Sequence, residues 1–217
     1  MSLAHRVSGY NRRRKWRLFQ DVIRPTAETT VLDVGFSDRE YSPNDNFLEK
    51  NYAWPENITA LGVDAPVEFP RRYPSIQAVQ YDGGDFPFPD KAFDVCWSNA
   101  VIEHVGTHAD RRGSQVRFVQ EATRVAKTSF ITTPNKWFPI EVHTRTPFLH
   151  WLPKRWFDAY LRMRDNEWAT GDYMDLLSFQ AFRAVLRQAD IGPYRVYKNR
   201  LGGISMDFVA VFGDGAR

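Results

Sequence analysis

Short apolar segments recur along the first 135 residues and alternate with segments of helical or irregular pattern. Five of these apolar segments contain β-branched residues and are expected to be strands: 30–34, 60–63, 76–81, 93–97 and 129–133. Strands that alternate with helices at this spacing predict a parallel sheet with crossover connections.

Two further segments carry apolar residues at the helical period. Residues 10–24 mix Arg and Lys with apolar side chains and predict an amphipathic helix, which Pro25 ends. Residues 115–126 place Val116, Val119 and Ala122 on one face, and they predict a second helix between the last two strands of the series.

The C-terminal part returns to a regular pattern at Ser178. Ser178 is a suitable N-cap for a helix that Gly192 stops, and two strands follow at 194–199 and 206–212. We expect these strands to pair antiparallel at the sheet edge. The whole pattern predicts one α/β domain over residues 1–217, a doubly wound Rossmann-like fold with a mostly parallel seven-stranded sheet and an antiparallel C-terminal edge strand.

Residues 135–175 interrupt this pattern. They contain several prolines and four of the seven tryptophans, which we interpret as an inserted cap. Such an insert can serve as a lid over a site, or as a dimer face, and the sequence leaves both open.

Composition narrows the class of protein. The 29 basic side chains are opposed by 26 acidic ones, so the formal charge is only +3 and a nucleic-acid partner is not expected. The single cysteine, Cys96, lies in an apolar run and cannot form an internal disulfide, which fits a reducing cytoplasm. We see no signal peptide and no apolar stretch long enough to cross a bilayer, so a soluble, cytoplasmic protein is expected.

Acidic residues follow three successive predicted strands. Asp33 and Gly35 come at the end of the first, Asp64 ends the second and Asp82 ends the third. Ligands of open α/β sheets bind at the carboxyl ends of the strands, where a carboxylate can hold a ribose diol or accept a hydrogen bond from an exocyclic amine. The arrangement predicts a nucleoside site.

Four motifs, taken in order, resemble the class I S-adenosylmethionine-dependent methyltransferases, and most of all the broad group that includes the quinone-biosynthesis methyltransferases. They are VLDVG at 31–35, GVD at 62–64, DGGDFPFPDKAFDV at 82–95 and SNAVIEHV at 98–105. The resemblance covers roughly residues 10–135 and resumes at 178–212.

The resemblance implies S-adenosyl-L-methionine as the cofactor and a role for ten residues. Asp33 and Gly35 would flank its methionine part, and Phe36 next to them would also bind the cofactor. Asp64 would hold the ribose, Ala65 would pack on the adenine, and Asp82 and the Gly83 amide would read the adenine edge. Ser98, Asn99 and Ala100 would line the methionyl end. The chain departs from the family where Phe36 and Ser37 replace further glycines and where residues 42–46 read SPNDN, which leaves the shape of this loop open.

Methyl transfer is an in-line displacement that depends chiefly on positioning, with a base needed only if the acceptor loses a proton. His104 is a candidate base or substrate hydrogen-bonder, or a residue of the local turn. Glu141 and His143 stand two residues apart in the cap and could hold and deprotonate a hydroxyl. We expect no metal site.

The cap segments TPNKWFPIEVHT at 133–144 and PFLHWLP at 147–153 resemble those of bacterial methyltransferases associated with polysaccharide and cell-surface biosynthesis. The resulting hypothesis is methylation, on oxygen, of a small molecule or glycan intermediate. Two alternatives stay open: a tRNA or rRNA methyltransferase, and a methyltransferase-like fold that binds a nucleoside without catalysis. The basic run at 12–15 either grips phosphates or is the solvated face of the first helix.

Overall fold

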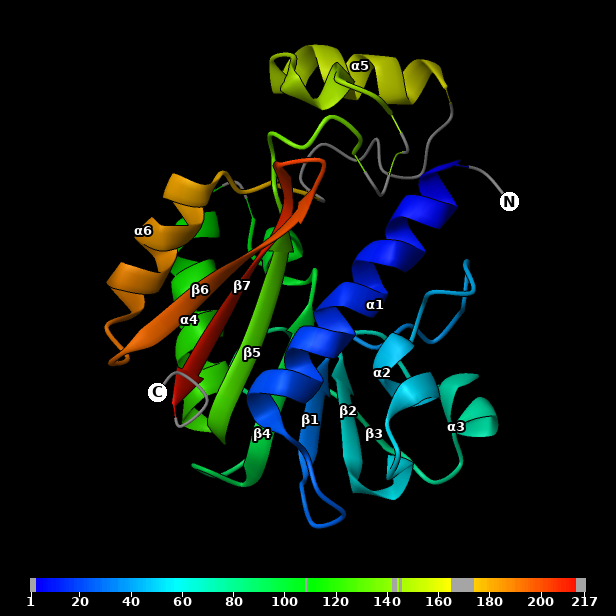
Figure 1. Cartoon of the computed structure of the whole chain (residues 1–217), viewed down its shortest axis with the longest axis vertical. Coiled ribbons are helices and arrows are strands. Elements are labelled where there is room, and N and C mark those ends of the chain that lie inside the picture. The colour runs from blue at the N-terminus through cyan, green and yellow to red at the C-terminus, as the bar shows by residue number, and fades with distance from the viewer. Residues whose placement is uncertain (1–2, 108, 142–143, 145, 165–173, 214–217) are drawn as a thin grey trace.

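Seven strands form one sheet in the order β3-β2-β1-β4-β5-β7-β6 (Figure 1). The computed structural model describes residues 3–107, 109–141, 144, 146–164 and 174–213. The first five strands run parallel, and β7 is antiparallel to both of its neighbours. The strands are β1 (Val31–Val34), β2 (Ile58–Gly62), β3 (Gln77–Gln80), β4 (Phe93–Asn99), β5 (Ala126–Pro134), β6 (Tyr194–Leu201) and β7 (Ile204–Gly213).

Helices cover both faces of the sheet. The α-helices are α1 (Leu3–Ile23), α2 (Phe47–Asn51), α3 (Phe69–Arg72), α4 (Arg111–Arg124), α5 (Lys154–Met163) and α6 (Phe179–Ala189), and the 3-10 helices are η1 (Pro55–Asn57), η2 (Ile102–His104) and η3 (Leu149–Trp151). α4 and α6 cover one face, whereas α1, α2 and α3 lie on the other (Figure 1).

The period-two alternation of strand side chains separates the two cores. Leu32 of β1 packs in the core under α4 and α6, and its neighbour Val31 packs in the core under α1. Asp33, two residues after Val31, therefore lies on the α1 face of the sheet. This register places its carboxyl group next to the helix that the N-terminal segment forms.

The predicted fold class is confirmed: the sheet is mostly parallel and doubly wound. β7 lies between β5 and β6, so β6 is the edge strand on this side of the sheet. Burial gives the reason, because seven consecutive residues of β7 are buried whereas β6 is largely accessible. A strand between two others is covered on both faces, and an edge strand is not.

The helix boundaries differ from the sequence prediction in three places. α1 begins at Leu3, well before residue 10, and α4 begins at Arg111. Ser178 is the N-cap of α6 as predicted, and its hydroxyl accepts a hydrogen bond from the Ala181 amide. α6 ends before Gly192, because Asp190 already adopts the left-handed conformation at φ 47°.

The described part of the insert forms a cap beyond the carboxyl ends of the parallel strands, with α5 outermost (Figure 1). Phe138, Phe157 and Leu161 are buried in it. Within the described residues, no helix is long and apolar enough to cross a membrane.

Candidate functional site

A cleft of about 810 Å³ opens at the carboxyl ends of β1, β2 and β4. Its walls come from the segments that follow these strands, from α2 and from the N-terminal half of α1. This is the position at which open α/β sheets bind ligands, since the chain crosses to opposite faces on leaving β1 and β4.

Gly35 allows the chain to turn sharply at the end of β1. Its φ is +97°, and a Cβ at this position would lie 2.4 Å from Cγ2 of Val101. Its amide donates to the Leu61 carbonyl of β2 at 2.8 Å. Both this backbone conformation and the close approach to Val101 require glycine. Gly35 thus lets the end of β1 meet the segment after β4 at the floor of the cleft.

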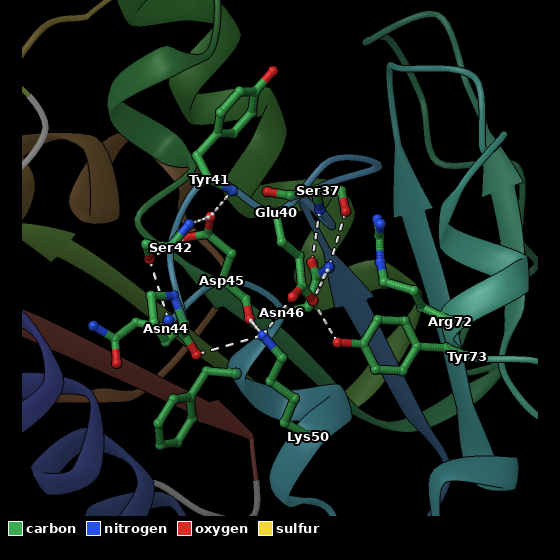
Figure 2. A network of polar contacts seen from close by, with 12 residues as sticks. Ser37, Glu40, Tyr41, Ser42, Asn44, Asp45, Asn46, Lys50, Arg72 and Tyr73 are labelled. Carbon is green, nitrogen blue, oxygen red and sulfur yellow. Dashed lines mark hydrogen bonds and ion pairs between the residues drawn. The ribbon is translucent and has the colours of Figure 1, made fainter.

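The loop from Ser37 to Asn46 is held by side chains (Figure 2). The side-chain amide of Asn46 accepts a hydrogen bond from the Ser37 N–H at 2.8 Å and donates one to the Ser37 carbonyl at 2.9 Å. It also donates to the Glu40 carboxylate. The Asp45 carboxylate accepts from the amides of Tyr41 and Ser42, each at 2.8 Å. The sequence left this loop's shape open, and these side-chain hydrogen bonds fix it.

Two charged residues extend this network to the neighbouring helices. Lys50 of α2 pairs with Glu40 at 2.8 Å and donates to the Asp45 carbonyl at 2.7 Å (Figure 2). Asp38 accepts three backbone N–H bonds at the start of α3, at 2.8 to 2.9 Å. The bond from the Phe69 amide, above all, lowers the pKa of Asp38. The loop is thereby fixed to the segment that follows β2.

Two buried carboxyl groups lie on the cleft wall beside one cation. Burial raises the pKa of Asp33 well above its usual range, and the neighbouring charge of Glu49 raises it further, while Arg12 opposes the shift. Burial also raises the pKa of Glu49. Arg12 donates to the Asn44 carbonyl and lies 3.9 Å from Asp45. A cationic ligand beside them would lower both pKa values and favour the ionised carboxylates.

A buried ion pair joins α1 to β7 at the other side of the cleft. Nζ of Lys15 lies 2.9 Å from Oδ2 of Asp207 and donates to Oδ1 of Asn99 at 2.6 Å. The two charged residues are only 4% and 3% exposed. Asn11 donates to the same Asp207 oxygen at 2.6 Å, and Thr132 donates to the same Asn99 oxygen at 3.0 Å. Such a pair persists in a protein interior because every charge has hydrogen-bond partners.

The structure brings most of the predicted cofactor residues to the cleft. Its lining includes Asp33, Gly35, Phe36, Asp64, Ala65, Asn99 and Ala100. Phe36 also belongs to the core, because its ring packs against Phe69 with centroids 4.6 Å apart. Ala100 adopts a left-handed conformation at φ +62°, and its amide donates to the Thr132 carbonyl.

Three predicted cofactor residues do not line the cleft. Ser98 is fully buried within β4, and its Oγ has no hydrogen-bond partner among the described residues. Asp82 is exposed beyond β3, where it accepts from the Gly84 amide at 2.8 Å. Gly83 follows Asp82, and a Cβ added to Gly83 would face Val63, the residue after β2. The roles assigned to these three residues stay predictions.

The predicted catalytic residues are separated. His104 ends η2 and lines the cleft. Glu141 does not line it: its carboxylate accepts from the amide and hydroxyl of Thr144, at 2.5 and 2.6 Å, and borders a cavity of only about 10 Å³ beneath the cap. The catalytic role of Glu141 stays a prediction, and its carboxylate is engaged by Thr144 here. His143 lies outside the described residues.

Several polar residues of the cleft wall were not expected there from the sequence: Asn11, Arg12, Lys15, Glu49 and Asp207. The signal for the first three was present. Polar residues at positions 8, 11, 12 and 15 follow the helical period, and apolar ones at 19, 22 and 23 continue the same face. The basic residues of this segment therefore face different sides of α1: Arg12 and Lys15 line the cleft, whereas Arg13 and Arg17 lie elsewhere on the helix.

Comparisons with known proteins show what the chain is similar to. The family model described as "Methyltransferase domain" matches residues 52–129. Two curated proteins of Mycobacterium tuberculosis, each named "Probable S-adenosylmethionine-dependent methyltransferase", are 35% identical over 68 residues. The aligned part is 30% of this chain and 22% of each relative, so the chain spans about a fifth of the relatives' length.

Solved structures share the fold over nearly the whole chain. A SAM-dependent methyltransferase from Aquifex aeolicus is 16% identical, with a TM-score of 0.57, over 91% of this chain and 88% of that one. An S-adenosylmethionine-dependent methyltransferase from Mesorhizobium loti is 12% identical, with a TM-score of 0.55, over 91% and 96%. The fold is therefore that of the class I methyltransferases.

These findings confirm the resemblance to class I S-adenosylmethionine-dependent methyltransferases. The predicted cofactor, S-adenosyl-L-methionine, agrees with the names of the curated relatives. The likeness to the quinone-biosynthesis group stays a prediction.

Proposed function

We propose that this protein is an S-adenosylmethionine-dependent methyltransferase that binds its cofactor in the cleft at the carboxyl ends of β1, β2 and β4. The observation that carries the proposal is the meeting of seven predicted cofactor residues, from three separate strand ends, on one cleft wall. No single local motif would produce this convergence.

The residues of the wall fit the parts of this cofactor. Asp64 is exposed at the end of β2, where its two carboxylate oxygens are available to a ribose diol. The carboxyl groups of Asp33 and Glu49 lie where the sulfonium and ammonium groups of the methionine part would bind, and these cations would favour the ionised form that burial alone disfavours. When bound, the cofactor supplies an electrophilic methyl group.

The acceptor in this proposal occupies the part of the cleft between α1 and His104, and it is a small molecule or glycan intermediate methylated on oxygen. Asn11, Lys15 and Asp207 make this wall polar, and their mutual bonds keep it rigid. In this proposal His104, which lines the cleft, accepts the proton that an attacking hydroxyl loses as its oxygen forms the new bond to carbon. A polar wall of this kind suits a hydroxylated acceptor better than an apolar one.

Calorimetric titration with S-adenosylmethionine tests the cofactor site. Asp64→Ala removes up to two charge-assisted hydrogen bonds, so the Kd should rise about ten-fold to a hundred-fold. Asp21→Ala, which removes an exposed acid from the outer side of α1, is the matched control and should leave the Kd unchanged. Equal affinity in wild type and Asp64→Ala would exclude the assigned ribose contact.

A further inference from the structure

Large apolar side chains are exposed in a cluster on the cap. Among the described residues, half of the exposed large apolar side chains fall within 137–163: Trp137, Phe148, Trp151, Leu152, Trp156 and Met163. Single exposed apolar residues are ordinary on a protein surface, whereas a cluster marks an interaction site. The proposed methyl transfer makes no use of these side chains.

The outer arc of α5 combines apolar and basic residues. Trp156 and Met163 are seven positions apart and therefore share one side of the helix, and they are 59% and 76% exposed. Arg155 and Arg162, also seven apart, lie beside them and are exposed. Phe157 and Leu161 occupy the opposite, buried side. The one acid of α5, Asp158, is half-buried and lies three and four positions from Arg155 and Arg162, so the arc carries two arginines beside one acid and keeps a net positive charge.

The turn before α5 holds its aromatic residues in fixed positions. The Trp151 ring lies 5.0 Å from Phe148 and 6.3 Å from Trp137, and its Nε1 donates to the Lys136 carbonyl at 3.1 Å. Lys136 Nζ lies 5.7 Å from the centre of the Trp137 ring. These residues present apolar surface with a polar group and a cation at its border, as residues at membrane interfaces do.

We propose that this cap face, formed by Leu152, Arg155, Trp156, Arg162 and Met163, binds the headgroup region of a bilayer that contains anionic lipid. Trp156 and Met163 would enter the boundary between headgroups and acyl chains, while the arginines pair with lipid phosphates. A second copy of the chain fits less well, because a two-fold contact would set the arginines of one copy against those of the other. Nucleic acid would leave Leu152 and Met163 without a partner.

The position of the cap gives this binding a consequence for the site. α5 lies at the same end of the molecule as the carboxyl ends of β4 and β5 and the start of α1 (Figure 1). Docking would bring the mouth of the cleft close to the lipid headgroups, and the acceptor would then be an amphiphile presented by the bilayer. This consequence rests on the proposed function, whereas the binding to lipid does not.

Vesicle cosedimentation tests the proposal, with vesicles of phosphatidylcholine alone and of equimolar phosphatidylcholine and phosphatidylglycerol. Wild type should bind the anionic vesicles, and Trp156→Ser with Met163→Ser should lower the partition coefficient at least about ten-fold. Val67→Ser with Ile204→Ser, which changes two side chains 59% and 46% exposed elsewhere, should bind like wild type. Arg155→Gln with Arg162→Gln should abolish the preference for anionic lipid.

Several results would overturn the proposal: no binding to anionic vesicles, equal binding by the serine pair and wild type, or a concentration-dependent dimer that the serine pair disrupts. Retention of the protein by single-stranded RNA in place of vesicles would do the same. Titration with S-adenosylmethionine is run on every variant. If lipid binding is absent while cofactor affinity is intact, the cap-face proposal fails and the proposed function does not. If the protein binds lipid but not the cofactor, the proposed function fails and the lipid site does not.

Discussion

Replacing Lys15 by methionine removes the cation of the buried pair that joins α1 to β7. The carboxylate of Asp207 would then remain buried, and removal of one partner from such a pair costs about 3–5 kcal/mol. Asp207 keeps the bond from Asn11 at 2.6 Å, and a hydrogen bond to a charged group contributes about 1.5–3 kcal/mol. We therefore expect a loss near the lower end, about 3 kcal/mol.

Urea unfolding at neutral pH, followed by circular dichroism, measures this loss. The double variant Lys15→Met with Asp207→Asn neutralises both charges and keeps the Asn11 bond, so it should unfold within about 1 kcal/mol of wild type. Lys127→Met breaks an exposed pair with Asp94 and should change the free energy of unfolding much less. A loss below about 1 kcal/mol for Lys15→Met, or no recovery in the double variant, would refute the reasoning.

Three further predictions concern the cleft. Gly35→Ala should lower the free energy of unfolding by about 1–3 kcal/mol in the same assay, because φ is +97° and the new Cβ has no space, while Gly202→Ala, at φ +56° with nothing within 4 Å, should cost less. Burial raises the pKa of Glu49 in the folded state, so the protein becomes less stable as the pH rises above the pKa of Glu49 in the unfolded chain. Glu49→Gln should therefore raise the Tm at neutral pH, and this gain should vanish on acidification. A lower Tm for the variant at neutral pH would contradict this. His104→Gln should lower kcat about 10²-fold or more towards a hydroxyl acceptor and leave the S-adenosylmethionine Kd unchanged, whereas an unchanged kcat would exclude His104 as the base.

Local pattern was sufficient to predict the fold class. The five parallel strands were expected from short apolar segments, because strands buried by helices on both faces show continuous apolar runs. The position of β7 was not expected, since pairing partners that far apart in sequence are chosen by the tertiary fold. The start of α1 was also missed, because the polar side of its first turns resembles an irregular segment.

The candidate site was predictable where it follows strand ends and unpredictable where it depends on packing. Asp33 and Asp64 could be placed because carboxyl ends of parallel strands share one edge. Glu49 and Asp207 could not, since their neighbours come from α1 and β1, distant in sequence. For Glu141 the sequence offered only a two-residue spacing, which could not predict that the amide and hydroxyl of Thr144 donate to its carboxylate.

The central claim is that the cleft at the ends of β1, β2 and β4 holds S-adenosylmethionine. The most direct measurement is a crystal structure of this chain with S-adenosylhomocysteine. We expect density for the ligand in the cleft, with its ribose at Asp64 and its amino acid part beside Asp33 and Asn99. Ligand density outside the cleft, or an empty cleft in crystals grown with saturating ligand, would contradict it.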